Sequence, residues 1–253
     1  MVEIEKGIGT LRERTLHATL KSYYEPNEAL HEQKYGGYIA DIKNEKGIIE
    51  IQTGSCYPLR KKLEDYLAPN DIDVQLVLPV VQNKWLSWID PETGEVTARR
   101  RSPKCGTPSD CLWELPYLRP FLTYPQFHLC ILMVDVEEYR NLDGWSRDRK
   151  HGSTRYERIP LSIGEEIHIE NATDCLQLLP PLPKTFTAKV FAKAAKLSPR
   201  KAQRAIWILR EMCLIEKIGT EKKAYIYRIS DDVPKYHDTC EKMTSEKSTL
   251  QNG

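Results

Sequence analysis

Acidic side chains on two neighbouring expected strands are the residues of this chain best suited to chemistry. Residues 36–53 read GGYIADIKNEKGIIEIQT, two short apolar strands joined by a turn at 44–47. The first strand carries Asp41, and the second carries Glu50 and Gln52 two positions apart, hence on one face. Burying unpaired carboxylates is costly, so two acids at the ends of adjacent strands favour a divalent-cation site. We predict that Asp41 and Glu50 bind Mg²⁺ or Mn²⁺, with the carbonyl of Ile51 as a further ligand.

These residues resemble the signature of the PD-(D/E)XK nuclease superfamily, whose fold restriction endonucleases and archaeal Holliday-junction resolvases share. That signature is a glutamate on a leading helix, then an Asp, then Glu-x-Lys on the next strand. Here Glu13 stands on the leading helix, Asp41 at the Asp, and Glu50-Ile51-Gln52 at Glu-x-Lys. The resemblance covers roughly residues 1–80. It implies a metal-dependent phosphodiester hydrolase acting on DNA, with Glu13, Asp41, Glu50 and Gln52 as catalytic residues, and a homodimer as one option.

One position departs from the family pattern, because Gln52 replaces the usual lysine. A glutamine can orient water by hydrogen bonding but supplies no positive charge. Lys43, Lys61 or Lys62 could supply that charge from a neighbouring element. The substitution also suits a second hypothesis, a catalytically inactive nuclease fold that acts as a DNA-binding or regulatory module. A regulator whose first domain binds a small ligand is the third.

Glu13 has a second interpretation. Residues 9–24 are predicted to form an amphipathic helix, in which Thr10 and Glu13 would make an N-terminal capping box. Glu13 and His17 are four positions apart and share one face of this helix. Because hard cations prefer oxygen ligands, we expect His17 to orient the site rather than to bind the metal.

The elements expected around these residues are those of an α/β protein. A helix at 57–67 and buried strands at 73–81 and 127–136 follow the hairpin. The predicted fold is a restriction-endonuclease-like mixed sheet flanked by helices, over residues 1–160, with a basic, proline-rich insertion or long loop at about 97–127. Residues 161–183, which end in LLPPLPK, are the predicted linker.

Residues 184–230 resemble a winged helix-turn-helix domain. Thr187 can cap a first helix, Ser198-Pro199 can begin a second, and a hairpin is predicted over 214–229. The polar residues 231–253 are predicted to be a disordered tail.

Charge is concentrated in this C-terminal segment. The whole chain has a net charge of +1, yet residues 184–230 carry 12 basic and 3 acidic side chains. Such a segment favours a polyanionic partner, here DNA, although winged helices can also bind proteins. Predicted nucleic-acid contacts are, on the second helix, Arg200, Lys201, Gln203, Arg204 and Trp207, and, in the wing turn, Lys222 and Lys223.

The composition indicates in which cellular compartment the protein is expected. No apolar run approaches the ~20 residues that a membrane helix needs, so no membrane partner is expected. The seven cysteines are scattered without a C-x-x-C pair, which is typical of reduced thiols in a cytoplasmic protein. Together the observations predict a metal-dependent DNA endonuclease with a winged-helix DNA-binding domain.

Overall fold

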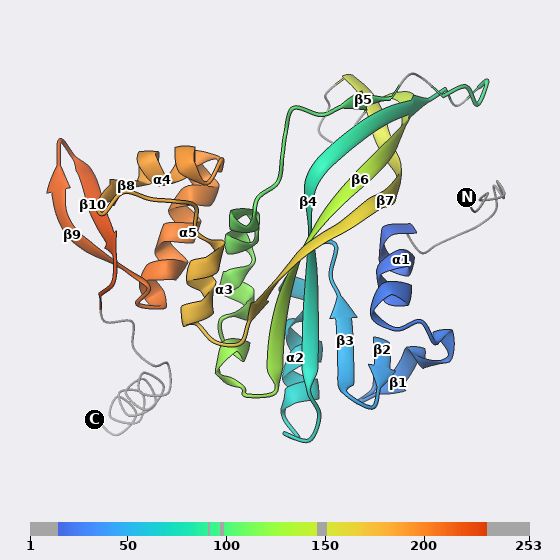
Figure 1. Cartoon of the computed structure of the whole chain (residues 1–253), viewed down its shortest axis with the longest axis horizontal. Coiled ribbons are helices and arrows are strands. Elements are labelled where there is room, and N and C mark those ends of the chain that lie inside the picture. Colours follow the sequence, from blue (N-terminus) through green and yellow to red (C-terminus); the bar gives the residue numbers. More distant parts are fainter. Residues whose placement is uncertain (1–14, 91, 97–98, 146–150, 232–253) are drawn as a thin grey trace.

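The chain has an α/β architecture in which helices flank a large mixed sheet (Figure 1). The computed structural model describes residues 15–90, 92–96, 99–145 and 151–231. The strands of the large sheet are β1 (His31–Tyr35), β2 (Tyr38–Asn44), β3 (Gly47–Ile51), β4 (Val74–Ile89), β5 (Arg100–Arg101), β6 (Phe127–Trp145) and β7 (His151–Ile169). The second sheet contains β8 (Phe186–Thr187), β9 (Ile215–Glu221) and β10 (Ala224–Ile229). The α-helices are α1 (Thr15–Tyr24), α2 (Arg60–Leu67), α3 (Leu115–Leu118), α4 (Ala188–Ala194) and α5 (Pro199–Glu211). Short 3₁₀ helices are η1 (Glu28–Leu30), η2 (Tyr57–Leu59), η3 (Pro108–Trp113), η4 (Phe121–Thr123) and η5 (Thr173–Leu178).

The large sheet has the strand order β1-β2-β3-β4-β6-β7, with β5 paired to β4. Strands β3 and β6 run parallel to β4, and the other neighbours are antiparallel. The predicted hairpin is confirmed, since Asn44 pairs with Gly47 across the turn. Gly47 has a φ of 132°, and a Cβ there would lie 2.2 Å from the Asp73 carbonyl oxygen. Only glycine therefore lets β3 start this close to the residue before β4.

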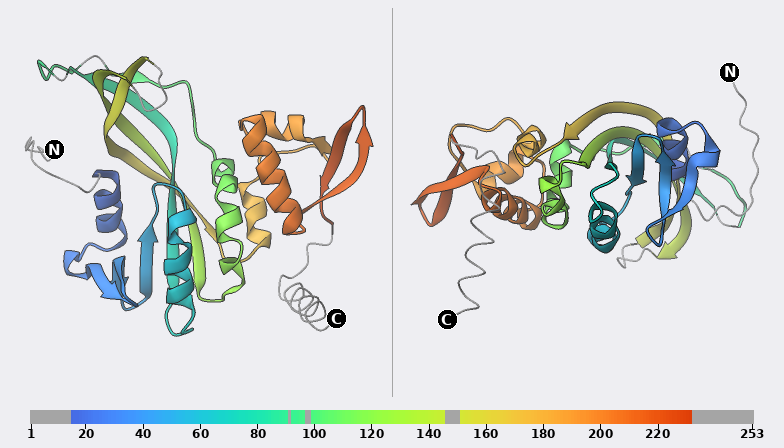
Figure 2. Two further views of the ribbon diagram at one scale, coloured as in Figure 1. Left: turned by 180° about the vertical axis from the view of Figure 1, so that it is seen from behind. Right: turned by 90° about the horizontal axis from the view of Figure 1, so that it is seen from below.

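Helices α1 and α2 cover opposite faces of the sheet (Figure 2). Leu16 and Leu20 of α1 belong to the same buried cluster as Ile51. Leu63 of α2 belongs to the other cluster, together with Ile48. Since Ile48 and Ile51 point to opposite faces of β3, this strand has apolar side chains on both sides, which is typical of a strand inside a covered sheet. Strand β1, which precedes the hairpin, lies at one edge of the sheet.

The prediction of a long loop at 97–127 is wrong over residues 108–123. These form η3, α3 and η4, which bury leucine and phenylalanine side chains in the main core. Those buried residues are Leu112, Leu115, Leu118, Phe121 and Leu122. The prolines begin short helices instead of interrupting them, because Pro108 and Pro116 stand in the first helical turn, where a missing N–H costs nothing.

The predicted boundary at residue 160 lies inside β7, which continues to Ile169. Residues 161–169 therefore belong to the sheet rather than to a linker. The rest of the predicted linker is also packed, since Cys175 and Leu178 are buried and Leu182 contacts the same core cluster. Strand pairing with β6 along nearly its whole length explains the difference, since the sequence shows little of this pattern locally.

The C-terminal segment forms α4, α5 and the three-stranded sheet in the order β8-β10-β9. The predicted caps are confirmed, since Thr187 Oγ1 accepts from the Val190 N–H and Ser198 Oγ from the Lys201 N–H. The rings of Phe186 and Phe191 stack at 6.0 Å. This unit shares one hydrophobic cluster with η3, α3 and the sheet. Among the described residues, no helix is long and apolar enough to cross a membrane.

Candidate functional site

Asp41 lies where strands β2 and β3 separate. The last ladder pair before it is Ile42 with Ile49, and beyond that pair Asp41 Oδ2 accepts the Ile51 N–H at 2.8 Å. His17 of α1 brings its Nε2 atom to 3.1 Å from Asp41 Oδ2 and 3.1 Å from the Ile51 carbonyl oxygen. Burial opposes ionisation of Asp41, but these hydrogen bonds outweigh it and hold the pKa of the carboxyl below its usual value. Asp41 is therefore an ionised acceptor at neutral pH.

Glu50 is the most unusual carboxylate of the site. It is 2% exposed and faces α2, where Lys62 Nζ lies 2.7 Å from its carboxylate oxygens. Burial, then the charge of Asp41, raises the pKa of Glu50 to about 7, although Lys62 opposes the shift. Tyr66, one helical turn after Lys62, also lies against it: burial and the charge of Glu50 raise the pKa of the phenol, which stays protonated. One ammonium group thus compensates this buried acid only in part.

His17 of α1 holds two of the predicted metal ligands, Asp41 and the Ile51 carbonyl, together, whereas the Glu50 side chain faces α2. Asp41 and Glu50 lie on adjacent strands, and the charge of Asp41 contributes to the raised pKa of Glu50. The Ile51 carbonyl shares the His17 imidazole with Asp41. Two carboxylates and a carbonyl form an all-oxygen donor set, which fits Mg²⁺ or Mn²⁺. The partial compensation of Glu50 is a second observation that fits a bound cation.

Gln52 and Glu13 do not complete this cluster. The Gln52 side chain donates from Nε2 to the Ser55 carbonyl at 2.6 Å and lines a neighbouring cavity. Glu13 lies outside the described residues, so its capping and catalytic interpretations both stay predictions. Of the three lysines considered as a replacement for the family's lysine, Lys62 lies at the acids. It also donates to the Ile39 carbonyl at 2.7 Å, which holds the ammonium between β2 and β3.

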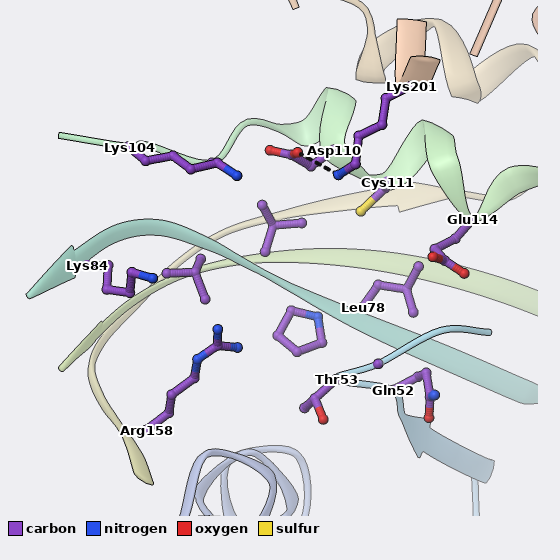
Figure 3. Close-up of a pocket in the computed structure, with 15 residues that line it drawn as sticks. Gln52, Thr53, Leu78, Lys84, Lys104, Asp110, Cys111, Glu114, Arg158 and Lys201 are labelled. Carbon is purple, nitrogen blue, oxygen red and sulfur yellow. Dashed lines mark ion pairs between the residues drawn. The ribbon is translucent and has the colours of Figure 1, made fainter. Parts of the chain in front are cut away.

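A cavity of about 380 Å³ begins where β3 ends, at Gln52 and Thr53 (Figure 3). Its walls carry four basic side chains, Lys84, Lys104, Arg158 and Lys201. The apolar floor comes from β4, including Leu78 and Val80. Such a cavity, next to a candidate metal site, suits an anionic group with an apolar body, as in a nucleotide.

Two of the cavity's basic side chains are positioned by a fully buried carboxylate on β6, Glu138. Arg158 Nε donates to Glu138 Oε2 at 2.9 Å, and Lys84 Nζ lies 3.5 Å from the same atom. Arg140 donates to Oε1 at 2.8 Å. Burial opposes ionisation, yet the arginine hydrogen bonds and Lys84 lower the pKa of Glu138 to about 2. The cavity lining itself contains four basic side chains and two acidic ones, Asp110 and Glu114, so positive charge is in excess there.

The predicted nucleic-acid contacts on α5 divide into two groups. Arg200, Lys201 and Arg204 face η3 and α3: the Arg204 guanidinium lies 4.4 Å from the Trp113 ring centre and 4.9 Å from that of Tyr117. Arg200 lies 5.9 Å from the Trp113 ring centre, and Lys201 Nζ is 3.7 Å from Asp110. The second group consists of Gln203 and Trp207 on α5 and Lys222 and Lys223 in the β9–β10 turn. All four side chains are exposed, and so is Arg200 of the first group. The sequence did not reveal this division, because η3 and α3, which pack on α5, belong to a segment that was expected to be a loop.

Replacing Arg204 with alanine is expected to destabilise the protein by about 1–2 kcal/mol, because two stacked aromatic contacts are lost. Binding to DNA at low salt is expected to change little, since the guanidinium faces Trp113 and Tyr117. Chemical denaturation measures the first effect and fluorescence anisotropy the second. Arg210→Ala, on the exposed side of α5, is the matched control. A large loss of DNA affinity without destabilisation would contradict this assignment.

The sequence contains little indication that several residues belong to the site. Lys62 and Tyr66 are four positions apart on α2, a spacing that places both on one helix face, but nothing local connects that face to Glu50. Glu138, Lys84 and Arg158 come from three long strands, whose register the local pattern does not reveal.

The chain is 29% identical over 181 residues to an uncharacterized protein of Treponema pallidum (strain Nichols), an alignment that covers 71% of each chain. No solved structure matches the chain significantly. A family model described as "Domain of unknown function (DUF8091)" matches residues 14–170, a range that contains α1, β1–β7, the acidic cluster and Arg158. The chain therefore belongs to this family, the DUF8091 domain.

Proposed function

We propose that this protein is a metal-dependent DNA endonuclease, with a PD-(D/E)XK-like core in the large sheet and a winged helix-turn-helix unit after it. The observation that carries the proposal is the placement of Asp41, Glu50 and the Ile51 carbonyl on neighbouring strands, where Asp41 accepts the Ile51 N–H at the point where β2 and β3 separate. These oxygens would form a hard-oxygen site beside a carboxylate that a single lysine compensates in part.

The order of elements supports the core assignment. A helix, a β-hairpin, a second helix and a strand occur along the chain as α1, β2–β3, α2 and β4, with the edge strand β1 between α1 and the hairpin. The hairpin carries the acids, and β4 runs parallel to β3 beside them. For the C-terminal unit, two capped helices followed by the β9–β10 hairpin support the winged-helix assignment.

Each residue has a stated part in this proposal. Asp41, Glu50 and the Ile51 carbonyl would hold Mg²⁺ or Mn²⁺, which supplies Lewis-acid activation of the phosphodiester and of water. Lys62 supplies the positive charge that Gln52 lacks, because its ammonium lies at Glu50. His17 orients Asp41 and the Ile51 carbonyl through its bridging Nε2.

The positively charged cavity supports DNA as substrate. Lys84 and Arg158 stand next to the loop that follows β3, so a backbone phosphate adjacent to the scissile one would reach them. The exposed face of α5 and the β9–β10 turn would add affinity away from the acids, where Trp207 and Lys222 are solvent-accessible.

Cleavage of labelled duplex, branched and single-stranded DNA, with RNA as a further substrate, tests the proposal. The parent protein is expected to cleave at least one DNA in Mg²⁺ or Mn²⁺, and Asp41→Asn is expected to abolish that cleavage. Glu45→Gln, an exposed acid in the turn of the same hairpin, is the matched control. Cleavage that survives in Asp41→Asn would overturn the assignment of the site.

A second candidate function is an inactive nuclease fold that binds DNA. Two observations favour it: the Gln52 side chain is engaged with the Ser55 carbonyl, and His17 already bridges two of the predicted ligand oxygens. Tight DNA binding without cleavage under any metal condition, together with absent Mn²⁺ binding in calorimetry, would select this function over the first.

Replacing both Lys222 and Lys223 with alanine is expected to weaken binding to DNA of any base sequence by a similar factor. Two lost phosphate contacts should reduce the slope of log affinity against log salt by about 2 units. Anisotropy titrations over a salt series measure this slope. The double variant Lys34→Ala/Lys46→Ala removes the same charge from exposed positions on the large sheet and should leave the slope nearly unchanged. Equal effects in both variants would indicate a non-specific charge effect.

A further inference from the structure

A group of potential metal ligands lies on β6 and β7, apart from Asp41 and Glu50. Cys130 on β6 pairs directly with His168 on β7, and Leu132 pairs with Glu166. Directly paired residues point to the same face of a sheet, so Cys130, Glu166 and His168 share one face. It is the face covered by α1, because Cys130 and Leu132 belong to the cluster that contains Leu16 and Leu20.

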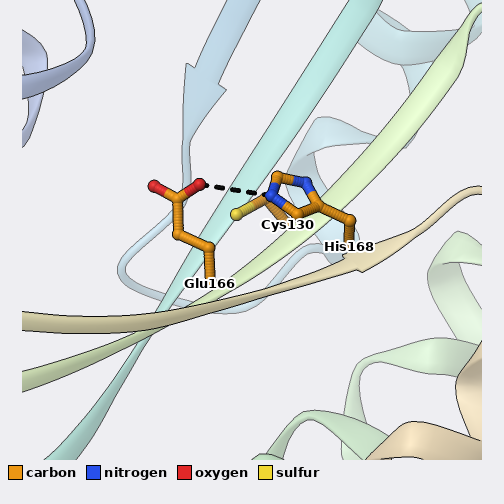
Figure 4. A group of neighbouring side chains, drawn as sticks. All are labelled: Cys130, Glu166 and His168. Atoms are coloured by element: carbon orange, nitrogen blue, oxygen red, sulfur yellow. Dashed lines mark ion pairs between the residues drawn. The ribbon is translucent and has the colours of Figure 1, made fainter.

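The ligand atoms of this group are already close together (Figure 4). The thiol sulfur, one carboxylate oxygen and one imidazole nitrogen all lie within 4.8 Å of one another. His168 Nε2 is 3.3 Å from Glu166 Oε2. Nitrogen and oxygen ligands of a tetrahedral zinc ion are separated by about 3.4 Å, so these two atoms already have the required spacing. The sulfur lies within 4.8 Å of both atoms, and a zinc-bound thiolate would stand about 3.6 Å from each, so an approach of the sulfur by at most roughly 1 Å closes the group on an ion.

The surroundings explain why the thiol would gain from a cation. Burial raises the pKa of Cys130 to about 11, and the charge of Glu166 adds to the shift. Hydrogen bonds from Tyr24 and Gln75 to the sulfur act in the opposite direction but do not offset burial. Tyr24, near the end of α1, donates to Glu166 Oε1 at 2.8 Å and lies 3.7 Å from the sulfur. The thiol, a carboxylate and a phenol therefore lie together with the His168 imidazole.

We propose that Cys130, Glu166 and His168 bind a divalent transition-metal ion of the zinc class. Sulfur, imidazole and carboxylate together select such an ion over Mg²⁺. Binding releases the thiol proton to solvent, so affinity should rise with pH. His168 is about half exposed, which gives an ion access from solvent. Tyr24 lies against the site, so the ion would anchor the C-terminal end of α1, the helix that carries His17, to the edge of the sheet.

Cobalt substitution in the full-length chain tests this site. After treatment with chelator and a non-thiol reductant, the protein is titrated with Co²⁺ and followed by absorption. One equivalent should produce a thiolate-to-cobalt charge-transfer band and the visible bands of tetrahedral cobalt, and Zn²⁺ should displace both. Cys130→Ser should lose the charge-transfer band. His168→Ala should weaken Co²⁺ binding by about tenfold or more.

Matched controls separate this site from others in the chain. Cys213→Ser removes an exposed thiol, and His128→Ala removes a partly exposed imidazole that contacts Glu170; neither should alter the titration. Asp41→Asn should also retain the cobalt spectrum, so the outcome is independent of the proposed nuclease function. Because Cys130 is buried, circular dichroism must first show that Cys130→Ser is folded; the more exposed His168→Ala provides the test if it is not. A parent protein without a thiolate band, or a band unchanged in both variants, overturns the proposal and leaves a hydrogen-bonded cluster.

Discussion

Replacing Glu50 with glutamine is expected to abolish metal-dependent DNA cleavage and, at the same time, to stabilise the metal-free protein at neutral and alkaline pH. Loss of a carboxylate ligand should reduce cleavage by about 10³-fold or more, since metal activation contributes several kcal/mol to the reaction. The gain in stability has a separate cause. Glu50 is buried beside Asp41, and only Lys62 compensates its charge, so ionising it in the folded state is unfavourable.

The sign of the pH dependence follows from the pKa. The pKa of Glu50 is raised from 4.5 to about 7 in the folded protein. Between those values the folded state holds a proton that the unfolded state has released, so the free energy of unfolding decreases as pH rises from about 4.5 to 7. This one group should account for a decrease of roughly 3 kcal/mol. The protonated Glu50 carboxyl thus stabilises the folded state fully in acid, and this contribution is absent above the pKa of Glu50 in the folded protein.

Urea unfolding with chelator at pH 5 and pH 8 measures the effect. Glu50→Gln should exceed the parent in stability by about 1–3 kcal/mol at pH 8 and by much less at pH 5. Glu45→Gln, an exposed acid of the same hairpin, should show neither the gain nor the loss of cleavage. If Glu50→Gln is less stable than the parent at pH 8, then Lys62 compensates Glu50 more fully than we infer.

Replacing Lys62 with methionine is expected to lower cleavage at neutral pH by about a hundredfold. Lys62 Nζ contacts the Glu50 carboxylate and the Ile39 carbonyl, and its charge is the one that opposes the raised pKa of Glu50. Without it, the pKa of Glu50 should rise further, so the acid is protonated at pH 7 and cannot bind a cation. Cleavage should partly recover at higher pH, and the pH–rate profile should shift to the alkaline side.

Two further variants distinguish a role in the reaction from a role in folding. Lys61→Met removes the neighbouring lysine, which pairs with Asp65 on the surface, and should leave the pH profile unchanged. Adding Gln52→Lys to Lys62→Met returns a lysine to the position where the family pattern has one. This double variant should regain part of the lost activity at pH 7. An alkaline shift that appears equally in Lys61→Met would argue against a specific role for Lys62.

Much of the candidate site was predictable because its signals are local. The two apolar runs in 36–53 and the turn at 44–47 between them determine that Asp41 and Glu50 stand on neighbouring strands. The caps at Thr187 and Ser198 likewise follow from side chains that bond their own helix termini. A period of two or of 3.6 residues and a capping residue act within a few positions, so one sequence is enough to reveal them.

For the basic helix α5, the local sequence is not enough to predict which of its side chains are exposed. Its sequence correctly separates an apolar stripe from polar flanks, but it cannot say which flank another segment covers. Residues 108–118 pack on one flank and place Trp113 against Arg204, while Trp207 on the other stays exposed. A charge pattern therefore predicts a basic helix but does not decide which of its arginines reach a partner.

The sequence by itself thus determined the acid pair, the hairpin that carries it, the helix caps and the concentration of basic charge after residue 183. Only the tertiary structure decided that Lys62 is the lysine at the acids, that Gln52 turns toward Ser55, and that Cys130 meets His168. The physical reason is sequence separation. Strand register and the packing of helices on a sheet depend on contacts between residues tens of positions apart, and no single segment encodes both partners of such a contact.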